Sequence, residues 1–128
     1  MTKKKIVVID DDPQILDTVA QLLVQGGFDV ATYRGRLNRI QFIAEQRPDL
    51  VLLDVNMPLV SGDALYEILR DHPALQRVPV LFFSSNDERD LRLLVQQTGA
   101  AGYVSKSELG GDFAGRLARR LDRLSRQV

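Results

Sequence analysis

The run from Leu50 to Pro58, LVLLDVNMP, is the feature that most restricts how this chain can fold. Four consecutive aliphatic residues are typical of a strand buried on both faces, the kind of strand that parallel sheets contain. The run ends on Asp54, and Pro58 just beyond it cannot donate to the hydrogen-bond ladder of a strand. Asp54 is therefore predicted at the carboxyl end of a central strand, where open α/β sheets place their ligand sites. Taken alone, the same residue also fits an ordinary turn position.

Strands and helices are predicted to alternate along the chain. The apolar runs that predict strands are 6–9, 28–32, 50–53, 78–83 and 101–105, and the second is less apolar than the first, as expected at a sheet edge. Five helices are predicted between and after these strands. The first and fourth cover 13–25 and 87–97, and the third begins at 61–63 and buries Ala64, Leu65, Ile68 and Leu69. The second and fifth are recognised by one apolar side each, formed by Leu37, Ile40, Ile43 and Ala44 and by Phe113, Leu117, Leu121 and Leu124. This alternation predicts an α/β fold, a doubly wound five-stranded parallel sheet with five helices on its two faces. Periodicity does not set the strand order, for which the doubly wound orders are the leading candidates.

The composition is that of one globular domain over residues 1–128, and it excludes several other classes of protein. A hydrophobic content of 45% and a net charge of zero argue against a disordered chain and against a basic nucleic-acid-binding protein. The chain has no cysteine and no apolar run of the ~20 residues that a membrane span needs, so we expect a cytoplasmic protein without membrane contact. His72 is the sole histidine, which excludes a histidine-based triad or a multi-histidine metal site. We interpret it as a solvated residue at a helix end.

Polar side chains stand at the carboxyl ends of four predicted strands. They are Asp10, Asp11 and Asp12 after the first strand, Asp54 after the third, Ser84 after the fourth and Lys106 after the fifth. If the first and third strands are neighbours, their carboxylates converge and raise one another's pKa unless a positive charge lies among them. A hard divalent cation with oxygen ligands suits that cluster, and Mg²⁺ typically binds few carboxylates together with phosphate oxygens. The set fits an in-line phosphoryl transfer to Asp54, with the metal, the ammonium and the hydroxyl group neutralising the phosphoryl oxygens.

Each of these residues also has a simpler interpretation. Asp12 is better explained as the N-cap of the helix that begins with Pro13 than as a metal ligand. Ser84 alone could cap the next helix, and Lys106 alone could be a solvated loop residue. All four strand ends carry such groups at one edge of the sheet, and this joint placement favours a functional site over the separate interpretations. Dinucleotide binding lacks its glycine-rich loop after the first strand, and an Asp-rich turn would repel the phosphate of a flavin.

With these residues in place, the sequence resembles the receiver domains of response regulators, the CheY-like family of two-component signalling, over essentially its whole length. The motifs that carry the resemblance are 9–13 (IDDDP), 53–58 (LDVNMP) with 61–62 (SG), 84–85 (SS) and 99–106 (GAAGYVSK). It implies a sheet ordered 2-1-3-4-5. It also implies phosphorylation of Asp54 by a phosphohistidine of a separate sensor histidine kinase or phosphotransfer protein. The single histidine of this chain agrees, since the donor histidine must come from a partner.

The resemblance further implies roles for individual residues. Mg²⁺ would be held by Asp11 directly, by Asp10 largely through water, by Asp54, and by the backbone carbonyl of Asn56. Ser84 matches the hydroxyl that moves to the phosphoryl group, Tyr103 the aromatic residue that changes rotamer with it, and Lys106 the lysine that pairs with the phosphate. The chain departs from the family at Ser107, where proline is common. A cis bond before serine costs roughly 2.5–4 kcal/mol, so we predict a trans Lys106–Ser107 bond with the ammonium still directed at the site.

The leading hypothesis is a phosphorylatable switch that catalyses only its own phosphorylation and dephosphorylation and is otherwise not an enzyme. It would bind a downstream protein through the face formed by the fourth helix, fifth strand and fifth helix, and would exist as a monomer or weak dimer. One alternative is a degenerate receiver that acts as a constitutive protein-interaction module. A remote alternative is a small phosphatase of the haloacid dehalogenase type, because 10–12 (DDD) satisfies an Asp-x-Asp pattern. That family usually continues with Gly-Thr or similar, whereas this chain continues with Pro13 and Gln14.

Overall fold

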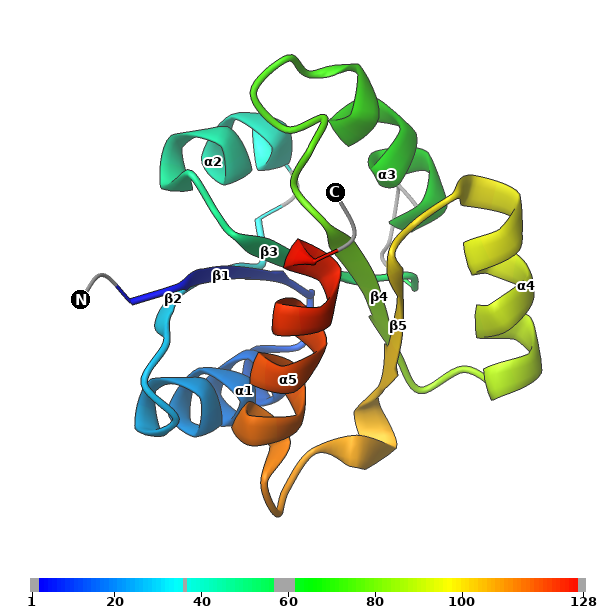
Figure 1. Ribbon diagram of the computed structural model, residues 1–128. Helices are drawn as coiled ribbons and strands as arrows, with labels where there is room; N and C mark the ends of the chain where they lie inside the picture. The colour runs from blue at the N-terminus through cyan, green and yellow to red at the C-terminus, as the bar shows by residue number, and fades with distance from the viewer. Residues whose placement is uncertain (1–2, 36, 57–61, 127–128) are drawn as a thin grey trace.

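A computed structural model describes residues 3–35, 37–56 and 62–126. Within these residues the chain forms one parallel sheet (Figure 1) from β1 (Lys5–Ile9), β2 (Asp29–Tyr33), β3 (Leu50–Asp54), β4 (Val80–Ser84) and β5 (Gly102–Ser105). The strand order is β2-β1-β3-β4-β5 and every pair is parallel. Both the predicted fold class and the order 2-1-3-4-5 are therefore confirmed. As expected for an edge strand, β2 has no buried residue, whereas every residue of β3 and β4 is buried.

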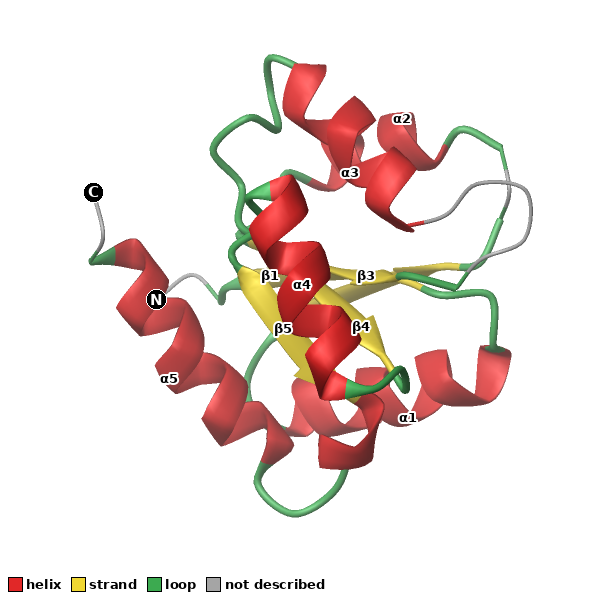
Figure 2. Cartoon of the chain, turned by 90° about the vertical axis from the view of Figure 1, so that its right-hand side faces the viewer, coloured by secondary structure: helices red, strands yellow, loops and turns green. Residues whose placement is uncertain are grey.

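Helices cover both faces of the sheet (Figure 2). They are α1 (Pro13–Gln25), α2 (Arg39–Gln46), α3 (Gly62–Asp71), α4 (Glu88–Thr98) and α5 (Phe113–Ser125), with a short 3₁₀ turn at Lys106–Glu108. Because successive strand residues point to opposite faces, Ile6 and Val8 of β1 pack with α1 and α5, while Val7 and Ile9 pack with the helices of the other face. No helix in the described residues has both the length and the apolar character needed to cross a membrane.

Helix boundaries follow the capping residues of the sequence. Asp12 accepts a hydrogen bond from the backbone N–H of Gln14 at 2.9 Å, and Pro13 occupies the first turn, so the N-cap interpretation of Asp12 is confirmed. Asp87 caps α4 in the same way, and Gly99 ends that helix with φ at 81°, a conformation that glycine adopts without a steric penalty. The site is thus flanked by well-capped helices.

Two helices differ from the prediction in the side that they bury. In α3 the buried residues are Gly62, Leu65, Tyr66 and Leu69, whereas Ala64 and Ile68 are exposed and the prediction for them was wrong. The ring of Tyr66 packs against Phe82 with centroids 5.8 Å apart, so the larger aromatic side chain takes the inward position.

The second helix also begins later than its predicted stripe. Asn38 has a left-handed backbone with φ at 60°, so α2 starts at Arg39. Leu37 lies before the helix with its side chain 77% exposed, and its prediction as a buried helical residue was wrong. Met57, Pro58 and Ser61, which belong to the motifs of the resemblance, lie outside the described residues.

Gly62 lets α3 approach the end of β3, and its replacement should measurably destabilise the fold. A Cβ atom there would lie 2.7 Å from the Cα of Val55 and closer still to the backbone oxygen of Asp54. Because both neighbours are backbone, we expect Gly62→Ala to lower the free energy of unfolding by about 2 kcal/mol in urea titrations. Asp63→Ala in the same turn removes only a helix-dipole interaction of about 0.3–1 kcal/mol and serves as the control. Equal stability of the two variants would contradict the packing argument.

Candidate functional site at the carboxyl ends of β1, β3, β4 and β5

Three carboxylates meet where β1 and β3 end side by side. Asp10 follows β1, Asp54 ends β3, and the register of the two strands places Ile9 beside Leu53. Asp10, Asp11 and Asp54 each offer a carboxylate oxygen, and these oxygens lie within 4.8 Å of one another. Asp10 and Asp54 are buried, with exposed fractions of 0% and 2%, whereas Asp11 is exposed. The structure therefore brings together the three acidic residues that the sequence analysis named as metal ligands.

Asp10 is held in place by two donors that reach it from different parts of the chain. Its Oδ1 accepts a hydrogen bond from the backbone N–H of Asp12 at 3.0 Å. Its Oδ2 lies 2.8 Å from the ammonium of Lys106, which forms an ion pair with it. A fully buried carboxylate is tolerated only when it is paired in this way.

Lys106 carries the positive charge of the site. Its Nζ lies 2.8 Å from Asp10 and 3.6 Å from Oδ1 of Asp54, and its side chain is 16% exposed. Burial of the ammonium lowers its pKa, but the hydrogen bond and charge of Asp10 and the charge of Asp54 outweigh burial, so the pKa of Lys106 is raised. The Lys106–Ser107 bond is trans, and the ammonium still reaches the carboxylates, as predicted.

The pKa of Asp54 is raised above the ordinary value of an aspartate. Burial of the carboxylate is the main cause, and the charges of Asp10 and Asp11 act in the same direction. The backbone N–H of Asn56, which donates to Oδ1 of Asp54 at 3.1 Å, and the ammonium of Lys106 oppose the shift. Three carboxylates face one ammonium, so the cluster carries an excess of negative charge.

This donor set fits a magnesium ion. Its oxygens are the ligands that Mg²⁺ prefers, and three carboxylates share the single ammonium of Lys106. Asp10, Asp11 and Asp54 would hold the ion. The further predicted ligand is the backbone carbonyl of Asn56. This residue is exposed and lies two positions after Asp54 in the sequence.

Removal of the Asp54 charge should stabilise the metal-free protein. A folded-state pKa above the ordinary value favours the protonated form, so the corresponding stability is present below the ordinary pKa and is lost as the pH rises through the folded pKa. At neutral pH we therefore expect Asp54→Asn to raise the free energy of unfolding measured by urea titration in EDTA. The gain should shrink below about pH 4, where Asp54 is protonated in both states. Asp17→Asn on the exposed side of α1 is the matched control, and an equal gain there would contradict the argument.

Ser84 ends β4 and is fully buried beside this cluster. Its Oγ accepts a hydrogen bond from the backbone N–H of Asn86 at 3.0 Å and lies 3.3 Å from Nδ2 of Asn56. Because Asn56 also donates its backbone N–H to Asp54, one residue bridges the hydroxyl and the carboxylate. The structure therefore places Ser84 next to the site through Asn56.

Asn86 is a site residue that the sequence analysis missed. Its amide pairs with that of Asn56 across the mouth of the site, with Nδ2 of Asn56 2.6 Å from Oδ1 of Asn86 and the return contact at 3.4 Å. The only signal in the sequence was its position two residues after Ser84. Such a position also fits an ordinary polar residue before a helix, so the pairing was not predictable.

Tyr103 and His72 lie away from the carboxylates. Tyr103 of β5 is half-buried, pairs in register with Phe82 of β4, and lines a groove between α4 and α5. His72 directly follows α3, where its Nδ1 accepts a hydrogen bond from the backbone N–H of Ala74 at 3.1 Å. The helix-end interpretation of His72 is thus confirmed.

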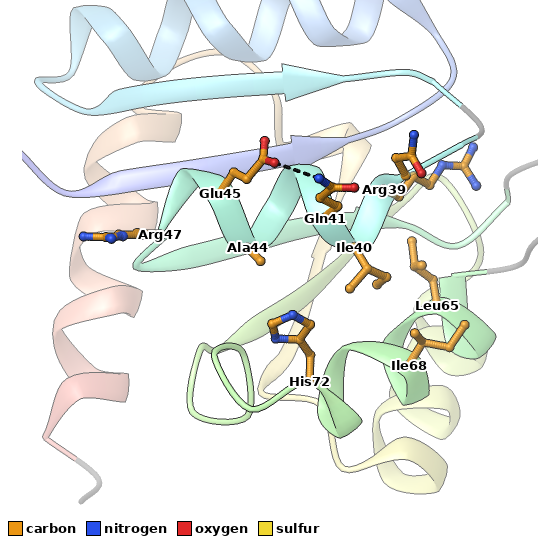
Figure 3. Close-up of a pocket in the computed structure, with 10 residues that line it drawn as sticks. Arg39, Ile40, Gln41, Ala44, Glu45, Arg47, Leu65, Ile68 and His72 are labelled. Carbon is orange, nitrogen blue, oxygen red and sulfur yellow. Dashed lines mark hydrogen bonds between the residues drawn. The ribbon is translucent and has the colours of Figure 1, made fainter.

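A second concave surface lies between α2 and α3 (Figure 3). This groove of about 810 Å³ is lined by Ile40, Ala44, Leu65, Ile68 and His72, among others. None of the site residues predicted from the sequence lines it. The chemistry predicted for this chain therefore belongs to the strand ends and not to the α2–α3 groove.

Sequence comparisons place the chain among signalling proteins. A model of the response regulator receiver domain family matches residues 6–114. The transcriptional regulatory protein CreB of Escherichia coli is 36% identical over 107 residues, which are 83% of this chain and 45% of CreB. Protein RcaC of Microchaete diplosiphon is 35% identical over 120 residues, which are 94% of this chain and 18% of RcaC. The chain thus spans less than half of the length of either relative.

Solved structures share the fold at lower identity. The chemotaxis protein CheY4 of Vibrio cholerae superimposes with a TM-score of 0.81 at 22% identity, covering 96% of this chain and 99% of CheY4. The receiver domain of the sensor histidine kinase PA1611 of Pseudomonas aeruginosa has a TM-score of 0.80 at 22% identity, covering 96% of this chain and 98% of that domain. The PA1611 receiver was crystallised with a magnesium ion in its active-site cleft. At these identities the likeness shows the fold alone.

Proposed function

This chain belongs to the response regulator receiver family, and from that membership we propose that it is a switch phosphorylated on Asp54. The donor would be a phosphohistidine on a sensor histidine kinase or a phosphotransfer protein. The observation that carries the proposal is the ammonium of Lys106, which lies 2.8 Å from Asp10 and 3.6 Å from Asp54 within the cluster of three carboxylates. This arrangement supports Asp54 as the nucleophile and Lys106 as the cation that would pair with the phosphorylated product, both at the carboxyl edge of the sheet.

In the proposed transfer an oxygen of Asp54 attacks the phosphorus atom in line with the phosphorus–nitrogen bond of the donor. That bond breaks, its electron pair remains on the imidazole, and a phosphorus–oxygen bond forms on Asp54. Lys106 would pair with a phosphoryl oxygen, and the hydroxyl of Ser84 would donate to another after leaving its present partners. Mg²⁺, held by Asp10, Asp11, Asp54 and the backbone carbonyl of Asn56, would supply charge neutralisation for the phosphoryl oxygens.

The phosphoryl group would leave in a second displacement, hydrolysis, in which water attacks phosphorus, the bond to Asp54 breaks with its electron pair on the carboxylate, and inorganic phosphate is released. The chain would then catalyse only its own phosphorylation and dephosphorylation. Membership of the receiver family removes the support for a dehalogenase-type phosphatase. A receiver that works only as a constitutive interaction module is the alternative that the experiment must exclude.

The test is to incubate the chain with acetyl phosphate and Mg²⁺ and to measure the intact mass. We expect one phosphoryl adduct in the native chain and in Asp17→Asn, and none in Asp54→Asn. A phosphorylated histidine kinase serves as the second donor. If neither donor yields an adduct on a folded chain, the proposal is wrong and the interaction module takes its place.

The proposed output surface is the face formed by α4, β5 and α5. Ser84 ends β4 next to the loop into α4, and Tyr103 lies on β5, so movement of these two side chains would reach that face first. We expect phosphorylation to change amide hydrogen exchange in α4 and β5 by at least about twofold, because local opening responds to small changes in packing. Asp54→Asn treated with the same donor is the control. Changes confined to α1 and α2 would contradict this choice of surface.

A further inference from the structure

A short 3₁₀ turn at Lys106–Glu108 follows β5 and carries the ammonium of the site. β5 ends at Ser105, which pairs in register with Ser84 of β4. The sheet ladder stops at this point, and the lysine side chain that follows has a flexible stem of four carbon atoms. The direction of the Lys106 side chain therefore depends on what fixes the backbone of the turn.

Two side-chain hydrogen bonds cap this turn reciprocally. Oε2 of Glu108 accepts the backbone N–H of Ser105 at 2.9 Å, and Oγ of Ser105 accepts the backbone N–H of Ser107 at 3.2 Å. The pair forms a capping box, in which two side chains satisfy backbone donors at the start of a turn. The carbonyl of Lys106 also accepts the backbone N–H of Leu109 at 3.3 Å. The backbone is thus fixed immediately before and immediately after Lys106.

Serine at position 107 makes these hydrogen bonds necessary. Proline, which is common here in the family, would itself lock φ at about −65° without any hydrogen bond. Serine does not restrict φ in this way, but it keeps the backbone N–H that proline lacks. Ser107 donates that N–H to Ser105, and the hydroxyl groups of the two residues lie 2.8 Å apart. The capping box therefore supplies a restraint that a proline ring would otherwise supply.

The turn is also anchored on its far side, and the Lys106 stem ends on a fixed partner. The guanidinium of Arg116 in α5 donates to the carbonyl of Glu108. At the other end, the Lys106 ammonium lies 2.8 Å from the buried Asp10 and 5.5 Å from the ring centre of Phe83. Only the stem of the lysine separates the capped backbone from the carboxylate cluster.

Glu108 acts on the backbone of the turn and not on the ammonium. Among the residues that the structure describes, the ion-pair partners of Lys106 are Asp10 and Asp54. Glu108 is exposed, so its carboxylate can be replaced without leaving a buried charge unpaired. An effect of Glu108 on the site would therefore pass through the position of Lys106.

We propose that Ser105 and Glu108 are positioning residues whose capping box holds the Lys106 ammonium against the carboxylate cluster. Loss of either cap would let the turn open, and the ammonium would exchange its buried partners for water. This placement is a property of the unphosphorylated chain. Its consequence for phosphoryl transfer rests on the proposed function, because a displacement of about 1 Å in a reacting site can cost about 100-fold in rate.

The first test follows the ammonium itself by ¹H–¹⁵N NMR of the full chain in EDTA. An ammonium held by buried carboxylates exchanges its protons slowly, and its nuclear Overhauser contacts with the ring of Phe83 identify its signal. We expect Glu108→Ala and Ser105→Ala to raise the exchange rate at least about tenfold. Glu108→Gln loses the same charge but keeps the acceptor, and should stay within about twofold of the native rate. Unchanged exchange in both alanine variants, or equal exchange in Glu108→Gln and Glu108→Ala, would overturn the proposal.

Asp112→Ala is the matched control, because it removes another side-chain cap from the same segment. Oδ1 of Asp112 accepts the backbone N–H of Gly115 at 3.1 Å at the start of α5. Loss of this cap should lower the stability of the chain but leave exchange of the ammonium within about twofold of native. An equal rise in Asp112→Ala and Glu108→Ala would show a general loss of stability and overturn the proposal.

The second test is the rate of adduct formation with acetyl phosphate and Mg²⁺. Glu108→Ala should lower this rate about tenfold, and Glu108→Gln should restore it to within about twofold of native. A native rate in Glu108→Ala, despite faster exchange of the ammonium, would overturn the role of the capping box in phosphoryl transfer. Failure of the native chain to form any adduct, with the ammonium responding as expected, would instead refute only the proposed function.

Discussion

Replacement of Lys106 by methionine is expected to lower the free energy of unfolding by about 3 kcal/mol at neutral pH in the absence of Mg²⁺. The Lys106 ammonium lies 2.8 Å from an Asp10 carboxylate whose exposed fraction is 0%. Methionine preserves the length of the side chain but leaves that carboxylate buried without a cation, next to the charge of Asp54. The measurement is urea or thermal unfolding of the two proteins in EDTA.

The control for this prediction is the double variant Lys106→Met with Asp10→Asn. Removal of both charges should restore most of the lost stability, because the uncompensated buried charge and not the packing of the side chain causes the loss. The double variant should stay inert toward acetyl phosphate even though it is folded. If Lys106→Met alone were as stable as the native chain, the ion pair would not be structural.

Asp11→Ala is expected to reduce Mg²⁺-dependent phosphorylation by at least about 100-fold while leaving the fold intact. Asp11 is the exposed member of the carboxylate cluster, so alanine removes a ligand without burying an unpaired group. The rate of adduct formation with acetyl phosphate at saturating Mg²⁺ measures the effect. Mg²⁺ titrations of the variant should show weaker binding than those of the native chain.

Asp12→Ala provides the matched comparison for Asp11. It removes the adjacent carboxylate, whose structural role is the cap of α1, and should reduce the free energy of unfolding by about 1 kcal/mol. Its phosphorylation rate should stay within about threefold of the native rate, because its oxygen serves the helix and not the cluster. A normal rate in Asp11→Ala, or an equal loss in both variants, would refute the proposed metal ligands.

Local sequence patterns were sufficient to predict the strands and helices of this protein. A buried parallel strand needs a run of apolar residues, a helix needs a cap and a stop, and both signals lie within a few residues of each other. For this reason the strands, the Asp12 cap and the Gly99 stop of α4 were predictable. The placement of carboxylates at strand ends was also legible, because the carboxyl ends of parallel strands meet at one edge.

The side that each helix buries against the sheet was less predictable. In α3 the apolar residues of the sequence fit two adjacent stripes, and the choice between Tyr66 and Ile68 depended on the ring of Phe82 in β4. In α2 the left-handed backbone of Asn38 determined that Leu37 stays outside the helix. Phe82 lies on a different element from the helix face that it controls, whereas Asn38 is adjacent to α2 but its backbone conformation is not visible in the pattern of apolar residues.

The sequence by itself determined the succession of strands and helices along the chain and the residues at the strand ends, because each of these is a short-range pattern. Through the resemblance of its short motifs it also determined the family. Only the tertiary structure decided the amide pair of Asn56 with Asn86 and the double contact of Lys106. Asn56 and Asn86 are 30 residues apart in the chain. Such contacts depend on the distance between two loops, and that distance is set by the packing of the whole sheet.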